Sequence, residues 1–162
     1  MNNALIDPRQ HHYILARSSA PTLMRLKPSS LICLPKGLNI DNVRLKESGL
    51  EMTLMYKGNN GEVALIFNRE MLQKTLDNQR IKDFLATYSY PTHNDINFHL
   101  EHLKKRLQGY FEGKNEFAHE IGLFLGYPFD DVLDFIKKDK RCYFCGYWKV
   151  FNNPQEALKI MD

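Results

Sequence analysis

A histidine and a glutamate stand side by side in the apolar stretch FAHEIGLFLGYPFDD, residues 117–131. Near neutral pH a histidine can act as an acid, a base or a metal ligand, and a carboxylate is a common partner. Successive helical residues are about 100° apart, so on a regular helix the side chains of His119 and Glu120 diverge and cannot form a dyad. Position 123 is leucine, so the second histidine of a His-Glu-x-x-His zinc motif is missing.

Beside His119, the helix expected over residues 117–127 carries a ridge of small residues, Ala118, Gly122 and Gly126. Glycine inside a helix costs roughly 1 kcal/mol relative to alanine, and close approach of another backbone or of a ligand would offset that cost. Two interpretations stay open. The stretch is either a tightly packed helix with His119 at its edge, or a surface that uses His119 as an acid, a base or a ligand.

Cys142 and Cys145 have the Cys-x-x-Cys spacing, which at a helix start suggests redox chemistry or half of a zinc site. Here they fall in a predicted strand, where they point to opposite faces, so two structural thiols are the simpler interpretation. Cys145, next to Gly146, is the better candidate nucleophile, and His119 is the base that could activate it. A total of three cysteines argues against a disulfide framework.

The run GYWKVF, residues 146–151, offers a candidate binding face. Alternation along a strand puts Tyr147 and Lys149 on one face and Trp148 on the other. A lysine flanked by aromatic rings suits an anionic or planar ligand. The alternative is a core strand with Lys149 at the edge of the sheet.

The other histidines do not predict a metal site. His99 and His102 are spaced i, i+3, which can chelate a metal, but cationic side chains follow them closely and disfavour a bound cation. We therefore expect both histidines on a solvated flank of their helix, with His93 nearby. The pair His11-His12 lies in a polar tail without companion ligands.

The composition is that of an ordinary globular protein, with 162 residues, 43% hydrophobic and 25% charged. The net charge of +3 is small and the basic residues are interleaved with acids, which argues against a nucleic-acid groove. The polar start lacks the pattern of a signal peptide, and the near-apolar run 121–129 is too short to span a membrane. We expect a cytoplasmic protein that binds neither membrane nor nucleic acid.

These residues must be positioned by an irregular mixture of helices and strands. Residues 1–12 are expected to form a flexible N-terminal tail, and residues 13–162 a single domain. The expected elements are a helix at 18–27, a strand at 30–35, a hairpin at 50–68 with its loop at 57–61, a helical stretch at 69–90 that breaks near Asp77-Asn78, helices at 92–111, 117–127 and 128–139, a core strand at 142–151 and a last helix beyond it. This order predicts an α+β fold, with a small, mostly antiparallel sheet of about four strands packed by several helices.

Four segments, SAPTLMRLKPSSL (19–31), LEHLKKRL (100–107), FAHEIGLFLGYPFDDVLDFI (117–136) and CGYWKVF (145–151), resemble the bacterial domain-of-unknown-function family 3793. The resemblance runs from about residue 14 to the C-terminus. It implies a small cytosolic protein of anaerobic Gram-positive bacteria and no established activity. The family often has a cysteine just before the Ala-Pro-Thr-Leu segment, where this chain has Ser18 and Ser19, and it usually extends beyond the last helix to another cysteine, whereas this sequence ends at Asp162. Both departures argue against obligate multi-cysteine metal chemistry.

The sequence favours a non-catalytic module that binds a small ligand or cofactor in a pocket between the 117–127 helix and the 145–151 strand. The candidate ligand-binding residues are His119, Gly122, Gly126, Tyr127, Tyr147, Trp148 and Lys149. One alternative is a thiol-dependent enzyme that uses Cys145 with His119, and another is a protein-interaction or regulatory module. No metal ligands are expected, and the identity of a cofactor and the oligomeric state stay open.

Overall fold

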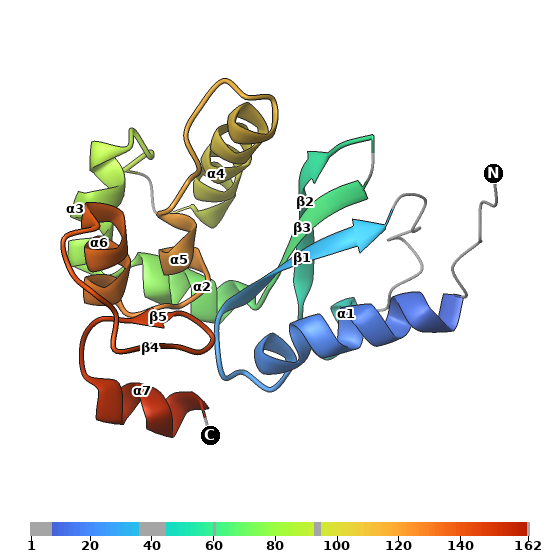
Figure 1. Ribbon diagram of the computed structural model, residues 1–162. Coiled ribbons are helices and arrows are strands. Elements are labelled where there is room, and N and C mark those ends of the chain that lie inside the picture. Colours follow the sequence, from blue (N-terminus) through green and yellow to red (C-terminus); the bar gives the residue numbers. More distant parts are fainter. Residues whose placement is uncertain (1–7, 36–44, 60, 93–94, 162) are drawn as a thin grey trace.

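The computed structural model describes residues 8–35, 45–59, 61–92 and 95–161. The fold is α+β, as predicted from the mixed order of the elements (Figure 1). The helices are α1 (Pro8–Leu23), the short 3₁₀ helix η2 (Lys46–Ser48), α2 (Arg69–Leu76), α3 (Gln79–Thr87), α4 (Ile96–Phe111), α5 (Ile121–Phe124), α6 (Phe129–Lys137) and α7 (Pro154–Met161). The strands are β1 (Ser29–Pro35), β2 (Glu51–Lys57), β3 (Gly61–Phe67), β4 (Phe144–Cys145) and β5 (Lys149–Val150). Within these described ranges, no helix combines the length and the apolar character that crossing a membrane requires.

The main sheet has three antiparallel strands in the order β1-β3-β2. The hairpin predicted over residues 50–68 is confirmed, and the Gly58 N–H donates to the Gly61 carbonyl across its turn at 2.9 Å. The apolar run Val63–Phe67 lies in β3, which is paired on both sides and therefore buried at the centre of the sheet. The fourth expected strand is not part of this sheet, because residues 144–150 fold into a separate two-stranded hairpin.

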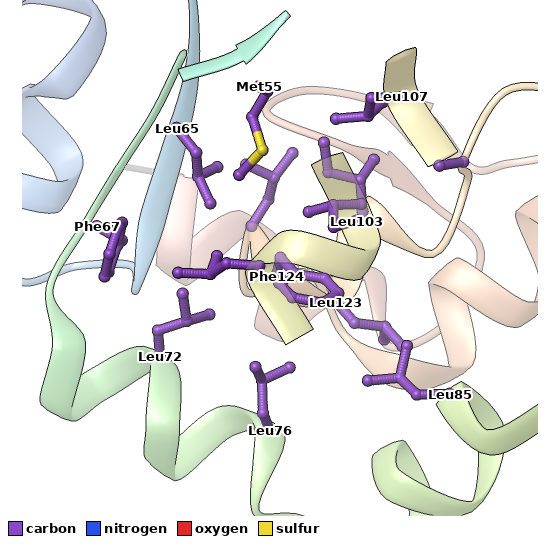
Figure 2. Close-up of a cluster of buried hydrophobic side chains, with 14 of the residues drawn as sticks. Met55, Leu65, Phe67, Leu72, Leu76, Leu85, Leu103, Leu107, Leu123 and Phe124 are labelled. Atoms are coloured by element: carbon purple, nitrogen blue, oxygen red, sulfur yellow. The ribbon is translucent and has the colours of Figure 1, made fainter. Parts of the chain in front are cut away.

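Alternate residues of β3 face two different apolar clusters, as the pleat of a strand requires. Leu65 and Phe67 enter the larger cluster, which the helices α2 to α6 complete, and Ala64 and Ile66 enter the smaller one. Figure 2 shows the larger cluster, in which Phe124 of α5 is fully buried. Helix α1 lies on the opposite side of the sheet from α4 (Figure 1).

Asparagine and aspartate side chains begin three of the predicted helices. The break expected near Asp77-Asn78 is confirmed, because α2 ends at Leu76 and the Asn78 side chain accepts from the Arg80 N–H at the start of α3. Asp95 caps α4 in the same way, accepting from the Asn97 N–H at 2.8 Å. Such caps satisfy N–H groups that have no partner inside the helix, and they mark helix starts reliably.

The first helix begins earlier than predicted. Residues 18–27 were expected to form it, with Pro21 in the first turn, but α1 runs from Pro8 to Leu23 and places Pro21 near its end. Proline removes one helical N–H donor, and the helix ends two residues later, at Leu23. Just beyond this end, Arg25 has a positive φ of 57°. Residues 8–12, assigned to a loose tail, therefore lie in α1, while residues 1–7 are outside the described part of the chain.

Candidate functional site

The segment 117–127 is not the continuous helix that we predicted. Only Ile121–Phe124 is α-helical, and the residues before it form tighter turns, in which the Gly122 N–H donates to the His119 carbonyl at 3.2 Å. The angular positions expected for a regular helix are therefore wrong. His119 and Glu120 do point different ways, because Glu120 is fully buried in the core while His119 is half-buried against two phenyl rings.

Gly126 ends this helix instead of extending a ridge along it. Its φ is +78°, and the Gly126 and Tyr127 N–H groups donate back to the Leu123 and Gly122 carbonyls, which is the Schellman pattern of a helix C-terminus. Close approach does occur at both glycines, but against different neighbours. A Cβ on Gly122 would lie 2.9 Å from Val132 Cγ2, and a Cβ on Gly126 would overlap Pro28.

Replacing Gly126 with alanine is expected to lower the free energy of unfolding by about 2–5 kcal/mol. The left-handed backbone costs an L-residue roughly 1–2 kcal/mol, and the overlap with Pro28 adds an overpacking cost of roughly 1–3 kcal/mol. Gly113→Ala is the matched control, since Gly113 has a φ of +71° and nothing within 4 Å of its Cβ position. Urea unfolding of both variants measures the difference, and equal losses would contradict the Pro28 contact.

A cavity of about 230 Å³ opens where this segment meets α6 and the β4–β5 hairpin. Its walls come from four parts of the chain: β1 contributes Leu31, α6 contributes Asp131, Val132 and Phe135, and the segment 117–127 and the hairpin contribute the rest. Figure 1 shows the hairpin lying beside α6, on which it packs. The rings that line the cavity are those of Phe117, His119, Tyr127, Phe135 and Trp148.

The aromatic rings contact each other around the cavity. Tyr127 and Trp148 are stacked, with their ring centroids 5.7 Å apart and their planes 28° apart. The imidazole of His119 lies edge-on to Phe117 at 5.3 Å and to Phe135 at 5.2 Å. Stacked and edge-on contacts are the preferred geometries of aromatic pairs, so the lining rings pack favourably on one another.

Two polar side chains of the cavity have capacity for further interactions. The Lys149 ammonium lies 5.2 Å from the centroid of the Phe135 ring and remains exposed to solvent. Within the described part of the chain, the ring nitrogens of His119 have no hydrogen-bond partner and Lys149 has no carboxylate partner. Both side chains contact Phe135, so the two candidate donors share one neighbouring ring in the cavity lining.

Asp131 fixes the hairpin that carries Trp148 and Lys149. Its buried carboxylate accepts from Trp148 Nε1 at 2.7 Å and from the Phe151 N–H at 3.0 Å. It also accepts from the backbone N–H and the side-chain amide of Asn152, at 2.8 and 3.0 Å. Sequence reasoning missed this anchoring role, because the partners of Asp131 lie 17 to 21 positions further along the chain.

The core strand predicted over residues 142–151 is also wrong. Its residues turn back at Gly146, whose N–H donates to the Trp148 carbonyl at 3.0 Å, and only two residues pair on each side. The alternation expected along one strand therefore fails, and Trp148 and Lys149 both line the cavity. Tyr147, at the tip of the hairpin, is 61% exposed and does not line it.

The predicted site residues thus separate into two groups. The cavity brings together His119, Gly122, Tyr127, Trp148 and Lys149. Gly126, Tyr147 and Cys145 do not contribute to its lining. Burial, and then the nearby Cys145 thiol, raise the pKa of Tyr127, so the tyrosine hydroxyl stays protonated at neutral pH.

The thiol alternative receives no support from the geometry. Cys145 is exposed in β4, directly across from Lys149 in the two-residue pairing. No hydrogen bond or ion pair joins Cys145 to His119 in the described residues, and the imidazole contacts phenyl rings instead. A cysteine nucleophile needs a base within hydrogen-bond reach, directly or through one water.

Behind His119, Glu120 forms a buried ionic cluster that sequence reasoning missed. The Arg106 guanidinium donates to both Glu120 oxygens, through Nε and through Nη2, the latter at 3.3 Å. The Tyr90 hydroxyl donates to the same carboxylate at 3.0 Å, and burial together with that negative charge raises the pKa of Tyr90. A glutamate in an apolar stretch was the only signal of this cluster, and it could not identify the partners.

The side chains of His99 and His102 lie against backbone carbonyl groups. His99 is 4% exposed, not solvated as expected, and its Nδ1 lies 3.2 Å from the Asp95 carbonyl. His102 Nε2 lies 3.0 Å from the Tyr88 carbonyl. Across the described residues, no group of three or more histidine, cysteine, aspartate or glutamate side chains gathers at one point. His93 and the side chains of His11 and His12 lie outside the described part.

Residues 15–162 match the family described as "Protein of unknown function (DUF3793)", which covers nearly the whole chain. No curated protein and no solved structure gives a significant match to the sequence. The resemblance noted in the sequence is therefore confirmed at the level of the family, and any statement about function must come from the site itself.

Proposed function

The chain belongs to the DUF3793 family of proteins of unknown function, and from the chemistry of its cavity we propose that it is a non-catalytic module that binds a small, planar, largely apolar molecule. The observation that carries this proposal is the aromatic lining, with five rings around a space of about 230 Å³. Ligand sites in proteins are typically concave and mostly apolar, with a few polar groups that orient the ligand.

The size of the cavity limits the ligand. Pockets for drug-sized ligands measure roughly 300–1,000 Å³, so a space of about 230 Å³ suits a smaller molecule of one or two rings. A nucleotide, a flavin or a haem would exceed it. The rings that line the cavity favour a flat aromatic ligand, because such a molecule can add stacked or edge-on contacts to those that the lining rings make with one another.

The single tryptophan of the chain provides a direct test, because Trp148 lines the cavity. Titration with benzamide or phenylacetamide, excited at a wavelength that these compounds do not absorb, is expected to change the tryptophan emission saturably. The reason is that a ligand in the cavity changes the polarity and the contacts around the indole ring.

The control variants separate occupation of the cavity from binding elsewhere. Leu31→Phe, which fills part of the space from β1, is expected to weaken the titration, whereas Leu158→Phe on the exposed face of α7 leaves it unchanged. Failure of both amides and of the corresponding carboxylates to change the emission would overturn the proposed function.

A further inference from the structure

On the basis of this proposed function, we further propose that the ligand is a small aromatic carboxylic acid, whose carboxylate is bound by Lys149 and His119. This proposal deepens the assignment of the same cavity, because it names the class of molecule that the polar end selects. It follows from the positions of the charged side chains around the cavity and from which of them already have a partner.

The polar end of the cavity is built around one phenyl ring. The Lys149 ammonium and the His119 imidazole each lie 5.2 Å from the centroid of Phe135, and all three residues line the cavity. An ammonium donates to a carboxylate, and an imidazole can donate from a ring nitrogen, so together they form a suitable anion-binding pair.

The charge of Lys149 is available, whereas some other lysines are paired with a carboxylate. Lys140 pairs with Asp134 at 2.9 Å and Lys57 with Glu62 at 3.2 Å, but Lys149 has no carboxylate partner among the described residues. Its ammonium instead lies over the ring of Phe135. Such cation–π contacts hold an ammonium in place without neutralising its charge.

A cationic ligand is disfavoured by the same site. Asp131 is the acidic residue in the lining, and its two oxygens already accept four hydrogen bonds from Trp148, Phe151 and Asn152. It has little remaining capacity for a ligand cation. A second lysine adds positive charge near the cavity, because the Lys27 ammonium lies 5.8 Å from the centroid of the Tyr127 ring. Burial lowers the pKa of Lys27.

The test compares phenylacetate with phenylacetamide, which share a ring and differ in charge, by titrating Trp148 fluorescence. The wild-type protein is expected to bind the acid about tenfold or more tightly than the amide, because hydrogen bonds to charged groups are the stronger kind. Lys149→Met keeps the length of the side chain but loses the charge, and is expected to reduce the preference to less than about threefold. Lys149→Arg should retain most of the preference for the acid. Lys105→Met, at an exposed position on α4, is the control for the change in net charge.

Each outcome decides between the two proposals. Equal binding of acid and amide overturns the carboxylate assignment and leaves the aromatic cavity as a ligand site. A preference that survives in both Lys149→Met and His119→Phe excludes these side chains as the anion site, and so overturns the inference. If neither compound binds, the proposed function fails and the inference fails with it. Loss of the preference in Lys149→Met alone, with amide binding unchanged, supports the inference.

Discussion

Replacing Arg106 with methionine is expected to lower the free energy of unfolding by about 3 kcal/mol. The substitution leaves the Glu120 carboxylate buried, with its side chain 1% exposed and, among the described residues, only the Tyr90 hydroxyl as a remaining partner. Breaking a buried ion pair by removing one partner typically costs roughly 3–5 kcal/mol. The low end is expected because the Arg106 side chain is 26% exposed, so water can reach the vacated position.

The measurement is urea unfolding of Arg106→Met beside two comparison variants. Lys114→Met is the matched control, since its partner Glu112 is exposed, and it should cost at most about 0.5 kcal/mol. The double variant Arg106→Met with Glu120→Gln should recover part of the loss, because a neutral amide is cheaper to bury than an unpaired charge. A loss below about 1 kcal/mol for Arg106→Met would show that the pair does not stabilise the core.

Replacing Asp131 with alanine is expected to lower the free energy of unfolding by roughly 3–4 kcal/mol and to abolish ligand binding. The change removes an acceptor of four hydrogen bonds, and hydrogen bonds to charged groups contribute about 1.5–3 kcal/mol each, although they are not additive. The buried Phe151 N–H loses its partner, and the Trp148 ring loses the contact that fixes its orientation.

Two measurements separate a local effect from a global one. The emission of Trp148 should move to longer wavelength in native buffer, because the indole ring becomes more exposed to solvent. The rate of amide hydrogen exchange should rise at residues 143–152 before it rises in β3. The neighbour Asp130 provides the control, since its exposed pair with Arg80 predicts a loss below about 1 kcal/mol on Asp130→Ala. Unchanged tryptophan emission in Asp131→Ala would contradict the anchoring role.

The fold could be predicted wherever local signals decide the structure. The hairpin at residues 50–68 has turn residues between two β-capable runs. The start of α3 is set by a hydrogen bond from the Arg80 N–H to the Asn78 side chain, two residues away in the sequence. Local preference failed where tertiary contacts decide. The helix pattern of residues 117–127 was overridden, because the turns before Ile121 let Glu120 reach Arg106, 14 residues back in the sequence, and Gly126 approach Pro28.

The site was predictable in its residue types but not in its geometry. His119, Trp148 and Lys149 were identified from an unusual histidine and an aromatic-flanked lysine, and the fold brings all three to one cavity. Their supports were not predictable, because Asp131 acts on residues 17 to 21 positions away, and no pattern within one segment encodes that distance. The strand alternation expected over residues 146–151 failed for a related reason, since the chain reverses at Gly146.

The composition of the cavity wall has a consequence for the order of events during synthesis. Its first contributor along the chain, Leu31, is made more than one hundred residues before Trp148 and Lys149. Chains are made from the N-terminus at roughly 5–20 residues per second, so the sheet and the helices α2 to α4 can pack well before the cavity closes. A nascent chain that stops before residue 148 would therefore carry most of the hydrophobic core and no complete binding site.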